Sequence, residues 1–132
     1  MIGIDTNVLV RYFAQDDPVQ SRKATAVMEQ HLTEQNPGFI SVVALAETTW
    51  VLERVYRLKN EEIAAVIERV LQADTLAVEH EAEVATALTA LWQGSGSFAD
   101  ALIGAIDAQA GCSRTLTFDR KALRLLGFEL LR

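Results

Sequence analysis

Short apolar runs alternate with longer helical segments along this chain, and that alternation restricts the possible fold more than any other feature. The runs that suit buried strands are Met1–Ile4, Phe39–Val42, Thr75–Val78, Thr115–Phe118 and Phe128–Leu131. The helical segments between them are Asn7–Phe13, Pro18–Leu32, Val42–Tyr56, Asn60–Ala73, Glu81–Trp92, Phe98–Gly111 and Asp119–Leu126. Strands that alternate with helices form a mostly parallel sheet covered on both faces. The sequence therefore predicts an α/β fold, and its 132 residues suit a single domain over residues 1–132.

The charge of the chain bears on its partners. It has 12 basic and 18 acidic residues and a net charge of −6, whereas nucleic-acid binding is usually accompanied by a basic surface. Net charge, however, counts carboxylates that hold a cation in the same way as carboxylates on the surface. The composition lowers the expectation of a nucleic-acid partner without excluding one.

The cysteine content and the first residues indicate the compartment. Cys112 is the single cysteine and cannot form an internal disulfide, which suits a reducing cytoplasm. The opening MIGIDTNVLVRYF carries Asp5 within its apolar run and no basic residue before it. That pattern is typical neither of a signal peptide nor of a membrane span. We expect a cytoplasmic protein with no membrane association.

Four acidic residues lie where a parallel sheet would gather them. Asp5 directly follows the first strand, and Asp119 directly follows the fourth. Glu47 lies in the second turn of the helix after the second strand, and Asp100 lies in the first turn of its helix. Ligands of α/β folds collect beyond the carboxyl ends of the strands. We therefore expect these four carboxylates to converge at one edge of the sheet.

Converging carboxylates need a proton or a cation between them. Two unit charges about 4 Å apart repel by roughly 4 kcal/mol at an effective dielectric constant near 20. Oxygen donors suit Mg²⁺ or Mn²⁺, whereas zinc prefers histidine and cysteine, and His31, His80 and Cys112 form no ligand pattern. Such a site can activate water for attack on a phosphodiester. Among the four, Asp5 and Asp100 are the strongest candidates for metal ligands.

Each of these acids also has a purely structural interpretation. Ser97 and Asp100 form the S-x-x-D pattern of a capping box, Asp119 can cap the helix after it, and Asp5 or Thr6 can cap the first helix. Glu47 lies inside a helix, where no cap is needed, and its structural interpretation is a charge on a solvated helix face. A further acid, Asp107, lies two turns beyond Asp100 and suits a structural role or an outer-shell contact through water; the sequence does not decide between them.

Four blocks of this sequence resemble the PIN-domain nucleases, most closely the VapC-type toxins of bacterial toxin–antitoxin pairs. In order, the blocks are IGIDTNVLVRYF, ISVVALAETTWVL, FADALIGA and TLTFDRKA. The resemblance implies a three-layer α/β/α sandwich around a parallel sheet and Mg²⁺- or Mn²⁺-dependent cleavage of RNA. The invariant acids of the family fall on Asp5, Glu47 and Asp100, and its more variable fourth acid falls on Asp119.

The resemblance also implies supporting residues and partners. Thr6, Asn7 and Thr117 match small polar positions that we expect to orient carboxylates or water. A homodimer and a cognate antitoxin of the VapB type are implied, the antitoxin sending an arginine or apolar arm into the acidic cleft. Arg11 and Arg120 are near the site segments in sequence and are our candidates for RNA phosphate contacts, although they also suit ordinary solvated helix charge.

Three functions remain open at this point. The leading one is a toxin endoribonuclease that cleaves structured RNA and inhibits translation. Carboxylate-bound metal does not by itself select the sugar, so a nuclease acting on DNA is an alternative. The other is a non-catalytic PIN-fold module that binds nucleic acid or protein, against which the intact set of acids argues.

Overall fold

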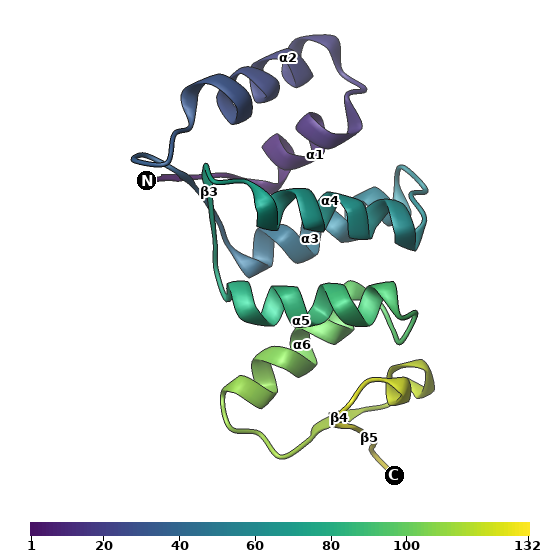
Figure 1. Cartoon of the computed structure of the whole chain (residues 1–132). Helices are drawn as coiled ribbons and strands as arrows, with labels where there is room; N and C mark the ends of the chain where they lie inside the picture. The colour runs from purple at the N-terminus through teal and green to yellow at the C-terminus, as the bar shows by residue number, and fades with distance from the viewer. The chain divides into compact units, whose positions relative to one another are not determined.

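Every pair of neighbouring strands in this protein is parallel. The computed structural model describes residues 1–132 and contains two compact units, unit 1 (Met1–Glu79) and unit 2 (His80–Arg132), each with its own sheet (Figure 1). The predicted fold class, an α/β fold with parallel strands and helices between them, is confirmed.

Unit 1 is built on a three-stranded sheet in the order β1-β2-β3. Its elements are β1 (Ile2–Gly3), α1 (Thr6–Ala14), α2 (Pro18–Ala26), the π-helix η1 (Val27–His31), β2 (Gly38–Ile40), α3 (Val42–Arg54), α4 (Asn60–Gln72) and β3 (Leu76–Val78). The register pairs Gly3 with Phe39 and Ile40 with Val78. The carboxyl ends of all three strands therefore lie at one edge of this sheet. Fully buried Leu9, Leu45 and Ile67 place the core between these helices and the sheet.

Polar side chains determine where the helices of unit 1 begin. Asp17 accepts hydrogen bonds from the backbone N–H groups of Val19 and Gln20 at 3.1 and 2.8 Å, so it caps α2 as its position before Pro18 predicts. Ser41 accepts from the N–H of Ala44 at 3.1 Å and caps α3. The α3 helix therefore begins immediately beyond the end of β2.

Unit 2 contains two helices and a two-stranded sheet. Its elements are α5 (Glu81–Trp92), α6 (Phe98–Gln109), β4 (Thr115–Thr117), the 3-10 helix η2 (Arg120–Arg124) and β5 (Phe128–Leu130). The α5 and α6 helices pack against each other, and Figure 1 shows β4 and β5 following them in green and yellow. A Cβ atom on Gly104 of α6 would lie 2.6 Å from Cε2 of Phe128, so the ring of β5 is packed directly on this glycine.

Some element boundaries differ from the sequence predictions. The segment Pro18–Leu32 is not one α-helix, because α2 gives way to the π-helix η1 after Ala26. The segment Asp119–Leu126 contains only a short 3-10 helix from Arg120 to Arg124, in which backbone N–H groups bond three residues back, as Ala122 does to Asp119 and Leu125 to Ala122. No helix of the chain combines the length and the apolar character needed to cross a membrane.

Candidate functional site

Asp5 lies at the carboxyl end of β1 and is exposed. It is the N-cap residue of α1, but only its backbone contributes to the cap, because its carbonyl oxygen accepts from the N–H groups of Val8 and Leu9. The carboxylate makes no capping hydrogen bond. Helix capping therefore does not occupy this side chain, which is free to bind a cation.

Glu47 lies in the second turn of α3, on the exposed side of that helix. Its neighbours in the helix, Thr48 and Thr49, are buried and donate their hydroxyl hydrogens to the carbonyl oxygens of Ala44 and Ala46. The Glu47 carboxylate takes part in no hydrogen bond or ion pair of the chain. Like that of Asp5, it is structurally unused.

Asp100 lies in the first turn of α6 and is half-buried. Ser97 caps this helix by accepting from the N–H of Asp100 at 3.1 Å. The reciprocal bond of a capping box, from the Asp100 carboxylate to the backbone N–H of Ser97, is not formed. The predicted capping box is thus only half present, and the carboxylate is not used for it.

Asp119 is different, because its carboxylate has a structural role. Its Oδ1 accepts from the N–H of Lys121 at 2.9 Å and caps η2, as the structural interpretation predicts. The hydroxyl oxygen of Thr117 in turn accepts from the N–H of Asp119 at 3.0 Å. Thr117 therefore holds the backbone of Asp119 rather than its carboxylate.

The four carboxylates divide between the two units. Asp5 and Glu47 belong to unit 1, where both follow strands that pair with each other in parallel, while Asp100 and Asp119 belong to unit 2. No group of three or more histidine, cysteine, aspartate or glutamate side chains is close enough to hold a metal ion. The convergence of all four acids remains a prediction from the sequence.

Asp107 has a structural partner. Its Oδ2 accepts a hydrogen bond from the hydroxyl of Thr115 at 2.8 Å, which ties the last turn of α6 to the start of β4. This contact gives the half-buried Asp107 carboxylate a role within unit 2 that requires no metal.

Glu79 is an acid at a strand end that the sequence reasoning did not single out. It follows β3 as Asp5 follows β1, and the same rule applied to the run Thr75–Val78 would have found it. Its Oε1 accepts from the N–H of Val42, the first residue of α3, at 3.0 Å. At the edge of the unit 1 sheet where its strands end, Asp5 thus follows β1 and Glu79 follows β3, with α3 beginning beyond β2.

The remaining predicted site residues are the two small polar residues beside Asp5 and the two arginines expected to contact phosphate. Thr6 is buried at the start of α1, whereas Asn7 beside it is exposed. Arg120 is exposed at the start of η2 and has no ion-pair partner within the chain. Arg11, the other candidate for phosphate contact, is already engaged by neighbouring side chains.

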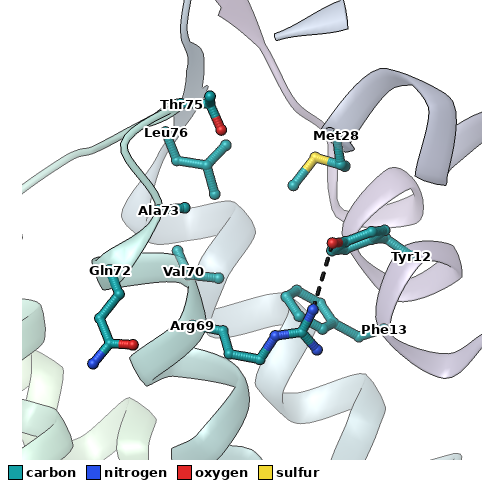
Figure 2. A pocket seen from close by; sticks show the side chains of 9 residues that line it. All are labelled: Tyr12, Phe13, Met28, Arg69, Val70, Gln72, Ala73, Thr75 and Leu76. Atoms are coloured by element: carbon teal, nitrogen blue, oxygen red, sulfur yellow. Dashed lines mark hydrogen bonds between the residues drawn. The ribbon is translucent and has the colours of Figure 1, made fainter. Parts of the chain in front are cut away.

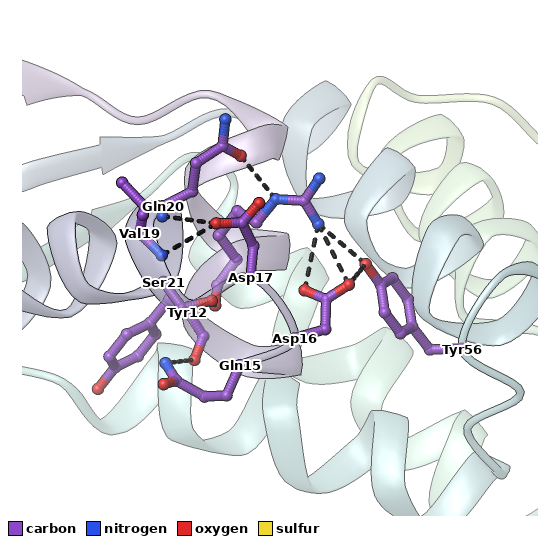
Figure 3. A network of polar contacts seen from close by, with 9 residues as sticks. Tyr12, Gln15, Asp16, Asp17, Val19, Gln20, Ser21 and Tyr56 are labelled. Carbon is purple, nitrogen blue, oxygen red and sulfur yellow. Dashed lines mark hydrogen bonds and ion pairs between the residues drawn. The ribbon is translucent and has the colours of Figure 1, made fainter.

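Arg11 is part of a polar network that joins α1 and α2 to the turn after α3, and Figure 3 labels its partners Asp16, Gln20 and Tyr56. Its guanidinium donates to Oε1 of Gln20 at 2.8 Å, to the hydroxyl oxygen of Tyr56 at 3.0 Å and to Oδ1 of Asp16 at 3.2 Å. The Tyr56 hydroxyl donates to Oδ2 of Asp16 at 2.6 Å. The hydrogen bond with Tyr56, followed by the charge of Asp16, raises the pKa of Arg11. These contacts compete with any role of Arg11 in binding phosphate.

A hollow of about 270 Å³ lies elsewhere in unit 1 (Figure 2). The Arg69 guanidinium stands 5.1 Å from the ring centre of Phe13 and 5.7 Å from that of Tyr12 at this hollow. Thr75 and Leu76, at the amino end of β3, line its other side. It is therefore at the opposite end of the strand from Glu79 and contains none of the predicted site acids.

The parallel α/β topology and the acids at strand ends define a class of protein that binds ligands at the carboxyl edge of a sheet. The chain belongs to the PIN domain family, which it matches over residues 2–128. PIN domains are generally metal-dependent nucleases. A comparison with curated proteins found no match.

Proposed function

We propose that this protein is a metal-dependent endoribonuclease, the toxin of a toxin–antitoxin pair of the VapC type, that cleaves structured RNA and inhibits translation. The observation that carries the proposal is the PIN family match over residues 2–128 in a chain that leaves the carboxylates of Asp5, Glu47 and Asp100 free of hydrogen bonds. Acids that serve only as helix caps would be bonded to backbone N–H groups. The proposal treats residues 1–132 as one PIN domain.

The donor chemistry of these residues fits Mg²⁺ or Mn²⁺, since all four side chains offer carboxylate oxygens. We assign metal binding to Asp5 and Asp100, with Glu47 and Asp119 completing the catalytic set. A divalent cation bound there would lower the pKa of a water molecule and stabilise charge on the phosphodiester oxygens. Thr6 and Asn7 beside Asp5, and Thr117 beside Asp119, would keep those acids in place.

Contacts to RNA would come from cations near the site. Arg120 is exposed next to Asp119 and carries no partner, which favours it as a phosphate contact. Arg11 would first have to leave Asp16 and Tyr56, so we rank it below Arg120. The net charge of −6 includes the four site carboxylates, which bound cations would neutralise in part.

The remaining parts of the proposal concern partners and location. We propose a homodimer in the cytoplasm whose activity is restrained by a VapB-type antitoxin. An arginine of the antitoxin placed among unbonded carboxylates would compete with the metal for them. Co-expression with the neighbouring gene product and a test of RNA cleavage would examine this part separately.

The direct test compares cleavage of a structured RNA by the wild-type chain and by Asp5→Asn, with Mg²⁺ present. We expect cleavage by the wild type, none by Asp5→Asn, and none by either in excess EDTA. Asp74→Asn is the matched control, because Asp74 is also exposed but lies outside the proposed site. It should cleave as the wild type does.

The other outcomes separate the alternatives. Full activity of Asp5→Asn, or undiminished activity in EDTA, would overturn the metal mechanism. Cleavage of a matching DNA in preference to the RNA would make the protein a DNA-directed nuclease. Binding of Mn²⁺ without cleavage of either substrate would favour a non-catalytic PIN-fold module.

A further inference from the structure

Glu79 contacts the junction between β2 and α3 at two points. Its backbone N–H donates to the carbonyl oxygen of Ile40 at 2.9 Å, and its Oε1 accepts from the N–H of Val42 at 3.0 Å. These two residues flank Ser41, the N-cap of α3. Glu79 therefore binds the last residue of the strand and the first residue of the helix together.

The side-chain contact satisfies a backbone group that the helix itself leaves free. The first N–H groups of an α-helix have no partner within it, and the amino end of the helix carries a partial positive charge. Ser41 takes the N–H of Ala44, and the half-buried Glu79 carboxylate takes that of Val42. A negative oxygen at this place stabilises the first turn of α3 and fixes where that turn begins.

The position of this turn determines the position of Glu47. Val42 and Glu47 are five positions apart in one continuous helix, a rise of about 7.5 Å along its axis. Because β2 pairs with β1 on its other side, the same strand end also determines where Asp5 lies. A shift at the start of α3 would move Glu47 relative to Asp5.

We propose that Glu79 is a positioning residue for the acidic site, holding the amino end of α3 so that Glu47 keeps its place relative to Asp5. This inference rests on the proposed function, because it assigns Glu47 to the metal-binding set. The inference gives Glu79 no role as a metal ligand; its role is the contact of its Oε1 with the backbone N–H of Val42. Outer-shell residues of this kind influence metal affinity through the ligands that they hold.

The test uses Glu79→Ala, which removes the acceptor, and Glu79→Gln, which keeps an acceptor oxygen at the same reach. Glu62→Ala is the matched control. Glu62 also accepts one backbone N–H at 3.0 Å at the start of a helix, that of Lys59 at α4, which is remote from Asp5 and Glu47 in the chain. The readouts are amide exchange of Val42 by NMR, the Mn²⁺ dissociation constant and the rate of RNA cleavage.

Glu79→Ala should make the Val42 amide exchange about tenfold faster and weaken Mn²⁺ binding by about 10- to 100-fold, with cleavage falling in parallel. Glu79→Gln should restore Mn²⁺ affinity to within about threefold of wild type, as an acceptor oxygen is retained. Glu62→Ala should leave Val42 exchange and Mn²⁺ affinity unchanged.

Two results would overturn the inference in different ways. If Glu79→Ala binds Mn²⁺ as tightly as Glu62→Ala while the wild type binds metal and cleaves RNA, the positioning role is wrong and the proposed function stands. If the wild type binds no Mn²⁺, both the proposed metal site and the positioning role are wrong. If the wild type binds Mn²⁺ without cleaving RNA, a loss of Mn²⁺ affinity in Glu79→Ala still supports the positioning role.

Discussion

Asp119 shows how one carboxylate can serve the fold and the proposed site at the same time. Its Oδ1 caps η2 through the N–H of Lys121, whereas Asp5 and Asp100 make no such bond. Capping uses one oxygen and leaves the other available to a cation. The two roles can be separated by substitution, because asparagine caps a helix about as well as aspartate and alanine does not.

We predict that Asp119→Asn and Asp119→Ala differ in stability but not in catalysis. Asp119→Asn should retain wild-type stability, and Asp119→Ala should lose about 1 kcal/mol through the cap. Both should reduce RNA cleavage to the same extent if the charge acts in the site, measured as kcat/KM beside urea unfolding. Wild-type cleavage by Asp119→Asn would remove this acid from the catalytic set.

A second residue-scale prediction concerns Asp16, which the network of Figure 3 holds in its charged form. The hydrogen bond from Tyr56 lowers the pKa of Asp16 below its ordinary value of 3.8, and the Arg11 guanidinium adds to this effect. Because the folded-state pKa is the lowered one, the contact stabilises the fold above pH 3.8. That contribution is lost as the pH falls from 3.8 through the folded-state pKa.

Tyr56→Phe should therefore raise the pKa of Asp16 towards 3.8, as followed by an NMR titration of its carboxyl group. The variant should also lose less stability than the wild type when acidified through that range. Tyr12→Phe is the control, since the Tyr12 hydroxyl donates to Glu29 instead. An unchanged Asp16 titration in Tyr56→Phe would contradict the network.

At the scale of elements, apolar runs and caps predicted nearly all strands and helices. Asp17 before Pro18 predicts the start of α2, and the run Thr115–Phe118 predicts β4; both are confirmed, because these signals are local. The bond between Glu79 and Val42 joins residues 37 positions apart. This bond can be predicted only when the parallel register of β2 and β3, which places Val78 beside Ile40, is known. The local sequence pattern does not contain that register.

The contact between α6 and β5 leads to an element-scale prediction. A Cβ atom at Gly104 would approach Phe128 to 2.6 Å, closer than packed carbon atoms allow. Gly104→Ala gains about 1 kcal/mol in helix propensity, but overpacking costs typically 1–3 kcal/mol. We expect a net loss of up to about 2 kcal/mol in urea unfolding, with α6 displaced at the turn after Asp100.

The matched background for this prediction is Phe128→Leu, which removes the ring that meets the new methyl group. In that background Gly104→Ala should become neutral or stabilising, because only the gain in helix propensity remains. Equal losses in both backgrounds would show that contact with Phe128 is not the cause.

At the scale of the whole molecule, the sequence identified the family and the candidate acids but not what each acid does in the fold. Four blocks spread over most of the chain resemble PIN domains, and the family match over residues 2–128 confirms that membership. The side-chain hydrogen bonds distinguish these acids. The Asp5 carboxylate makes no capping bond, the Asp119 carboxylate caps η2, and the Asp107 carboxylate accepts from Thr115. Such partners depend on orientation, which spacing alone does not determine.

The proposed site takes acids from both units, and this gives a prediction for the stability of the whole chain. Mn²⁺ at 100 times its dissociation constant should stabilise the wild type by about 2.7 kcal/mol, seen as a rise in Tm. Asp5→Asn and Asp100→Asn should each abolish that rise, and the double variant should lose no more than either one, because both remove the same site. Asp74→Asn should keep the full rise. A rise retained by Asp100→Asn but lost in Asp5→Asn would confine the metal to acids of unit 1 and would contradict a site shared by Asp5 and Asp100.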